Sequence, residues 1–162
     1  MLGRTAQVAT TEPRRRNAAA EADTSAATMA PLFKHLFPEL LALACDADVV
    51  PRQLFDPLVR QIIHWFTRNN SGERPETAAL LDSVMDGVCN TEDSALRDFC
   101  ADCIHEFFAW SIKQLPDDKA LLARGGNIVS VIKRLNSMAR HPSSYQRLGA
   151  ALAFNHIYKV SW

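Results

Sequence analysis

Long apolar runs are missing from this chain. None reaches the roughly 18 residues that a membrane-spanning helix requires. The strict alternation of apolar and polar residues that marks β-strands is also missing. The four cysteines among 162 residues are too sparse for a disulfide-stapled secreted domain, so we expect a reducing intracellular setting. Together these absences favour an all-α protein without a membrane partner, of a length that fits one domain with a substantial core.

Acidic residues are missing from the end of the chain. Residues 119–162 contain seven Lys and Arg and no Asp or Glu, a net charge of +7. Residues 30–118 contain seven Lys and Arg against fifteen Asp and Glu, a net charge of −8. Such a split can orient the molecule toward an acidic partner, or it can arise because the chain is a slice of a longer array that balances the charge elsewhere.

Large apolar residues are few in residues 1–29, which are rich in Ala, Thr and Arg. Such a segment cannot bury enough surface to offset the entropy lost on ordering. The sequence therefore predicts a disordered N-terminal tail over 1–29.

A repeated pattern organises the rest of the chain. Its markers are Arg52, Arg97 and Arg147, which are 45 and 50 residues apart. Each marker follows, by four residues, a side chain that can cap a helix; these residues are Asp48, Asp93 and Ser143. Aligned on the arginines, the apolar residues of the three copies fall into register without a gap. A period of this length, with helical spacing on both sides of a break, is typical of HEAT-type helix-pair repeats.

The predicted fold is all-α, a HEAT-like α-solenoid of three helix pairs within residues 30–162. The pairs are expected at about 31–67, 75–115 and 127–160. Pro38 is expected to bend the first helix or to mark a 3₁₀ start, and the second helix to begin near Pro51. The residues of that second helix predicted to face inward are Leu54, Phe55, Leu58, Ile62, Trp65 and Phe66.

The repeated positions have structural roles in this prediction. Arg52, Arg97 and Arg147 are expected to hydrogen-bond to the capping side chain four residues before, or to turn carbonyls, including those of a neighbouring repeat. Trp65 and Trp110 share a repeat position, so they are predicted to pack between repeats rather than to recognise a ligand.

A metal site or an active site is not indicated. Cys100-x-x-Cys103-x-His105 resembles half of a zinc site, but structural zinc needs four ligands and normally a second pair at a fixed distance. Cys45 and Cys89 belong to other predicted helices. We therefore expect the thiols of Cys100 and Cys103 to be buried and to bind no metal. No nucleophile or acid–base constellation is recognised, so no catalytic or cofactor-binding residue is assigned.

The basic end of the chain is the best candidate for binding. Lys133, Arg134 and Arg140 lie on one predicted helix and could contact a phosphate backbone without reading bases. The alternatives are a solvated helix face, or a patch that meets an acidic neighbouring repeat in a longer chain.

Several segments are more specific than this general pattern. They are residues 31–44 (PLFKHLFPELLALA), 57–67 (PLVRQIIHWFT), 94–100 (SALRDFC) and 110–114 (WSIKQ), His141-Pro142, Arg147–Ala150 and Ala153–Asn155. Over roughly 31–160 the chain resembles the DNA-dependent protein kinase catalytic subunit family, in the helical-repeat region that precedes the kinase domain. Residues 1–29 do not share the resemblance, and residues 116–126 differ from it.

The resemblance implies a nuclear, non-catalytic scaffold segment used in DNA double-strand break repair by non-homologous end joining. Implied partners are neighbouring repeats of a longer chain, DNA ends and the Ku heterodimer. The chain has no Gly-rich loop, His-Arg-Asp or Asp-Phe-Gly motif, so no kinase residue can be carried over. The alternative is a free-standing helical-repeat adaptor that binds another protein.

Overall fold

The computed structural model describes residues 29, 31–68, 74–114 and 126–158. The disordered tail is predicted over 1–29, and all of it except residue 29 lies outside the described residues, as do residue 30 and residues 69–73, 115–125 and 159–162. Within the described ranges every regular element is a helix, which confirms the all-α helical-repeat class. None of these helices is long and apolar enough to cross a membrane.

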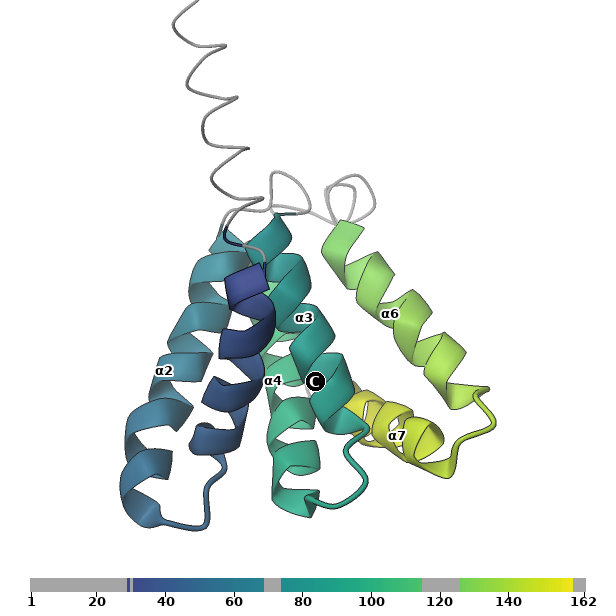
Figure 1. Ribbon diagram of the computed structural model, residues 1–162. Coiled ribbons are helices and arrows are strands. Elements are labelled where there is room, and N and C mark those ends of the chain that lie inside the picture. Colours follow the sequence, from purple (N-terminus) through teal and green to yellow (C-terminus); the bar gives the residue numbers. More distant parts are fainter. Residues whose placement is uncertain (1–28, 30, 69–73, 115–125, 159–162) are drawn as a thin grey trace, which may run out of the picture.

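The helices follow one another as antiparallel pairs (Figure 1). The first helix covers residues 31–44 and pairs with α2 (Val49–Arg68). The second pair is α3 (Pro75–Val88) with α4 (Ser94–Lys113), and the third is α6 (Gly126–Ala139) with α7 (Ser144–Tyr158). Helix α4 is central, because it packs against α2, α3 and α7. One continuous core therefore joins the three pairs, with Phe107, Leu135 and Ile63 among its fully buried side chains.

Capping residues mark where the second helix begins in the first and second pairs. The Asp93 carboxylate accepts a hydrogen bond from the amide of Leu96 at 3.0 Å, which identifies Asp93 as the N-cap of α4. Asp48 accepts from the amide of Val50 at 3.0 Å in the same way. Helix α2 therefore starts at Val49, and Pro51 lies in its first turn, where a missing N–H does no harm.

Neither proline inside the first pair breaks its helix. The structure has continuous α-helix through Pro38, so the predicted 3₁₀ start is wrong. Pro57 lies inside α2 in the same way. Both rings are on the exposed side of their helices. Water can therefore satisfy the carbonyl group that loses its partner at each position.

The inward row predicted for α2 needs a correction. Val59 and Ile63 are buried, whereas Leu54, Leu58 and Trp65 are exposed. Helix α2 has apolar residues on several sides, so its own periodicity does not select one face. Packing against α4 selects the side with Val59, and no described helix covers the side with Leu54, Leu58 and Trp65.

Two glycines permit close approach between helices. A Cβ atom on Gly149 of α7 would lie 2.6 Å from the carbonyl oxygen of Val88 and 3.2 Å from Cys89 Sγ, at the end of α3. A Cβ on Gly87 of α3 would collide with the Cys100 thiol of α4. Only a residue without a side chain fits these contacts, which fix how α3 meets α4 and α7.

Candidate functional site

The three repeated arginines make one and the same contact. From the first turn of α2, α4 or α7, each guanidinium reaches back to the turn before its own helix. Nη1 donates from Arg52 to Asp46 O at 3.0 Å, from Arg97 to Asn90 O at 2.9 Å, and from Arg147 to His141 O at 2.8 Å and Pro142 O at 2.6 Å. All these acceptors belong to the pair of the arginine itself. Each charge-assisted bond therefore ties a turn within its own pair rather than joining neighbouring pairs.

A second hydrogen bond recurs in the same turns. In each turn, a side chain accepts a hydrogen bond from the backbone N–H of the residue that lies four positions before the arginine. The bonds run from Asp48 N to Asp46 Oδ1 at 2.8 Å, from Asp93 N to Asn90 Oδ1 at 2.8 Å and from Ser143 N to His141 Nδ1 at 3.1 Å. Local polar groups thus close each turn without help from a neighbouring pair.

The two tryptophans at the shared repeat position have different surroundings. The Trp110 ring stacks on the His64 ring of the preceding pair, with centroids 4.0 Å apart, and Lys113 Nζ lies 4.8 Å from the Trp110 centroid. Trp65 is 52% exposed, so the prediction that it packs inward is wrong. The reason is positional: no described helix precedes the first pair, so Trp65 has no counterpart of His64 to stack on.

The three basic residues proposed for phosphate contact separate in the structure. Arg134 Nη1 bonds to Asp82 Oδ1 of α3 at 2.7 Å, which leaves its charge largely compensated. Lys133 is exposed on α6, and Arg140 is exposed in the turn that follows α6. The patch that remains for an anion therefore consists of Lys133 and Arg140, without a full contribution from Arg134.

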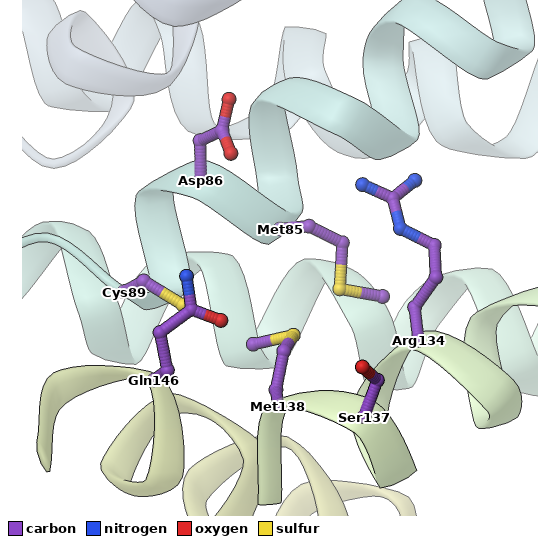
Figure 2. A pocket seen from close by; sticks show the side chains of 7 residues that line it. All are labelled: Met85, Asp86, Cys89, Arg134, Ser137, Met138 and Gln146. Carbon is purple, nitrogen blue, oxygen red and sulfur yellow. The ribbon is translucent and has the colours of Figure 1, made fainter. Parts of the chain in front are cut away.

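A cleft of about 230 Å³ opens between α3 and α6, with Gln146 of α7 at its edge. Figure 2 shows Met85, Cys89 and Met138 directing sulfur atoms toward the space between the helices, with Arg134 and Asp86 at its rim. Helix α7 packs on both α3 and α4, whereas α6 packs mainly on α7, which leaves this space between α6 and α3. Soft, flexible side chains of this kind fill irregular gaps in helical cores.

A polar network, which sequence reasoning missed, crosses three helices. Arg60 of α2 bonds to Asp56 in its own helix, to Asp102 Oδ2 of α4 at 2.8 Å and to Glu106 Oε1 at 3.3 Å. Asp102 Oδ1 lies 3.1 Å from His156 Nδ1 of α7. The network thereby links the first, second and third pairs. The i, i+4 spacing of Asp102 and Glu106 was the available signal, but nothing in the sequence connects them to Arg60, 42 residues earlier.

The network also sets the ionisation of Asp102. Partial burial opposes the charged form, but hydrogen bonds and attraction from Arg60 and His156 outweigh it. The pKa of Asp102 is therefore lower than its ordinary value. A carboxyl with a lowered pKa contributes stability that is present above its unfolded pKa, about 4, and is lost as the pH falls through the folded pKa.

Replacing Arg60 by Met is expected to lower the free energy of unfolding at pH 7 by about 1–2 kcal/mol, because three carboxylates lose their shared cation while remaining partly in water. The difference between wild type and variant should start to shrink near pH 4 and disappear as the pH falls through the lowered pKa of Asp102. Urea unfolding at pH 7 and pH 3 measures the difference. Lys34→Met, at an exposed position, is the control. A difference that stays the same at both pH values would contradict the assignment.

The cysteines are free thiols in the described helices. Burial raises the pKa of Cys100 and Cys103 in α4, and it also raises the pKa of the half-buried Cys45 and Cys89. Protonated, buried thiols are poor nucleophiles and poor ligands. No group of three or more His, Cys, Asp or Glu in the described part is arranged to hold a metal ion.

Several apolar side chains of the first described pair are exposed, although the residues at the equivalent positions of the other two pairs are buried. Leu36 is 40% exposed, but its counterparts Leu81 and Val131 are 8% and 1% exposed. Leu58 is 39% exposed, and its counterparts Cys103 and Ala153 are buried. The equivalent positions are therefore covered in the second and third pairs and open in the first. We name this surface the N-terminal end face; it consists of Leu36, Leu54, Leu58, Gln61 and Trp65.

The opposite asymmetry is found in the last described pair. Tyr158 of α7 is 64% exposed, whereas its counterparts Ile63 and Phe108 are 1% and 3% exposed. Ala151 is exposed, and its counterpart Ala101 is buried. The equivalent positions are therefore covered in the first and second pairs. We name this surface the C-terminal end face; it consists of Ile132, Ala151, Phe154, Asn155 and Tyr158.

Comparison with known proteins adds the family context. A family model described as "DNA-dependent protein kinase catalytic subunit, CC1/2" matches residues 27–161. The chain is 54% identical over 128 residues to the DNA-dependent protein kinase catalytic subunit of Mus musculus, which covers 79% of the chain and 3% of that protein. Similarity extends to the Xenopus laevis protein at 50% over 137 residues and the Dictyostelium discoideum protein at 41% over 144 residues. These alignments cover 84% and 89% of the chain, and again 3% of each relative.

Proposed function

This chain belongs to the family of the DNA-dependent protein kinase catalytic subunit, and we propose that it is a non-catalytic, HEAT-type scaffold segment of such a protein. Its place is then the nucleus, and its process is the repair of DNA double-strand breaks by non-homologous end joining. The segment supplies helical surface and spacing rather than chemistry. The Ku heterodimer and DNA ends are the partners of the assembly that it helps to build.

The observation that carries this proposal is the pair of open end faces. The apolar side chains of Leu36, Leu58 and Trp65 are exposed, and no helix among the described residues covers them. An array whose internal positions are apolar at both ends needs further pairs, or polar caps, to cover them. Because the matching segment is only 3% of the relatives' length, a longer array provides the simplest covering.

A preceding pair that covers Trp65 would make the effect of replacing Trp65 depend on whether that pair is present. In the chain alone, Trp65→Ala should change the free energy of unfolding by less than about 1 kcal/mol, because the side chain is half exposed. In a chain extended by the residues that precede the matching segment in the Mus musculus relative, the same change should cost about 3–5 kcal/mol. Urea unfolding of both forms measures this, and Trp110→Ala serves as the internal reference. Equal, small effects in both contexts would count against a covering pair.

Contact with DNA is supported by the charge of the third pair. Its described residues, 126–158, hold Lys133, Arg134, Arg140 and Arg147 and no acidic residue. Two of these charges are engaged, Arg147 by turn carbonyls and Arg134 by Asp82. We therefore assign phosphate contact to Lys133 and Arg140, with weak, sequence-independent binding that falls as salt increases.

The DNA contact is tested by salt titration of binding to a non-specific duplex. Lys133→Glu with Arg140→Glu should abolish binding without loss of helicity, since both side chains are exposed. The control is Lys34→Glu, a charge reversal on the first helix that should leave binding unchanged. If the double variant binds as wild type does, the third pair is not the DNA-contacting surface, while the scaffold proposal is still decided by the Trp65 experiment.

A further inference from the structure

The cleft between α3 and α6 has an apolar floor. The floor is formed by Met85 of α3 and Met138 of α6, which are 3% and 8% exposed. Figure 2 shows both thioether groups directed toward the space between the helices. The volume of about 230 Å³ is larger than the roughly 150 Å³ of an engineered cavity that holds benzene. The cleft therefore has room for one large side chain of another molecule, and methionine side chains adapt to what lies against them.

The rim of the cleft carries a carboxylate that the described part of the chain does not use. Asp86 is exposed, and its carboxylate has no hydrogen bond or ion pair with any described residue. Arg134 also lines the cleft, but its Nη1 is bound to Asp82 Oδ1 at 2.7 Å. These two carboxylates and one guanidinium leave the rim with a net negative charge, which resides on Asp86.

The other polar groups of the cleft are neutral. Burial, and to a smaller extent the charge of Asp86, raise the pKa of Cys89, so its thiol stays protonated at neutral pH. Ser137 and Gln146 contribute a hydroxyl and an amide, which can each donate or accept a hydrogen bond. The rim thus favours a cation over an anion, and the floor favours an apolar stem. A long basic side chain has both parts.

We propose that this cleft is a docking site for an arginine side chain of a protein partner. The aliphatic stem of that arginine lies on Met85 and Met138, and its guanidinium donates to the carboxylate of Asp86. Guanidinium suits this rim better than the ammonium of lysine, because it is planar, donates in a fixed fork and is less strongly hydrated. A phosphate is repelled by Asp86, so this site is separate from the phosphate contact assigned to Lys133 and Arg140. It goes beyond the scaffold role because it gives one part of the scaffold a partner of defined chemistry.

The test uses methionine methyl groups as reporters in NMR spectra of the isotope-labelled chain. Met85 and Met138 line the cleft, and Met29, which is 41% exposed, is the internal reference. Met85→Leu and Met138→Leu assign the two cleft signals. The probe is N-acetyl-arginine N-methylamide, which presents the side chain as a peptide does. N-acetyl-citrulline N-methylamide is the matched control, because it has nearly the same shape and no charge.

The arginine probe is expected to shift the Met85 and Met138 signals together and to leave Met29 unmoved. Its dissociation constant should be about 1–10 mM, because a single side chain supplies little affinity. The citrulline probe should bind at least about threefold more weakly, since it lacks the charge-assisted bond. Asp86→Asn should weaken binding of the arginine probe to the level of citrulline. Asp98→Asn, at an exposed acid of α4, should leave it unchanged.

Three results would overturn the proposal. The arginine probe could leave both cleft signals unmoved up to the limit of its solubility, bind no more tightly than citrulline, or bind Asp86→Asn as tightly as wild type. Circular dichroism checks that each variant keeps its helicity, which is expected because Asp86 is exposed. If Asp86→Asn does not fold, the comparison of the two probes on wild type decides. The Trp65 and duplex experiments remain separate tests of the scaffold role and of the DNA contact.

Discussion

Replacing Phe107 by Ala is expected to lower the free energy of unfolding by about 3–5 kcal/mol, which is a large part of the stability of a small domain. The ring is 2% exposed and belongs to the central helix α4, which packs against α2, α3 and α7. Its removal therefore leaves a cavity in the core shared by all three pairs. Equilibrium unfolding in urea, followed by circular dichroism at low temperature, measures the loss.

A milder variant keeps this test informative if the alanine protein does not fold. Phe107→Leu should lose about 1 kcal/mol, because most of the volume is retained. Leu54→Ala is the matched control: it removes a similar apolar side chain from an exposed position of α2, so its effect should be within about 0.5 kcal/mol. Equal losses for Phe107→Ala and Leu54→Ala would show that the core is not centred on α4.

Gly149→Ala is expected to have the second large effect on the free energy of unfolding. The sign of that effect tests whether α7 approaches α3 closely. In an ordinary helix this change stabilises by roughly 0.5–1 kcal/mol. Here the added Cβ would lie 2.6 Å from the carbonyl oxygen of Val88 and 3.1 Å from its carbonyl carbon, and backbone atoms cannot rotate away. We expect a net loss of about 1–3 kcal/mol from overpacking between α7 and α3.

The same unfolding measurement applies to this position, with Asn155→Ala as its control. Asn155 is an exposed residue of α7, so alanine there should be neutral or slightly stabilising through helix propensity. A gain in stability for Gly149→Ala equal to that of the control would show that α7 does not approach α3 as closely as the structure has it.

The helices and their limits were predictable because their causes are local. Asp93 caps α4 through a bond to an amide three residues on, and the apolar residues of α3 and α6 repeat with helical spacing. The burial of each face was less predictable, because it depends on which helix lies beside it. Leu58 and Cys103 share a repeat position, yet Leu58 is exposed and Cys103 is buried.

Contacts between pairs were the part that the sequence could not supply. Arg134 looked like one of three equivalent cations, but the approach of α6 to α3 brings it to Asp82, 52 residues earlier. Arg60 carried no signal beyond its i, i+4 partner Asp56, yet it lies where α2 and α4 meet. Side-chain partners across helices follow from the angles between the pairs, and these angles are set by packing as a whole.

The arginine-tied turns have a mechanical consequence. Arg52, Arg97 and Arg147 each fasten the turn of their own pair through main-chain carbonyls. Neighbouring pairs are joined by packing and by side-chain bonds, namely Arg60 to Asp102, Arg134 to Asp82 and Gln114 to Thr67. Tension along the segment would therefore load these bonds and the shared core rather than the turns.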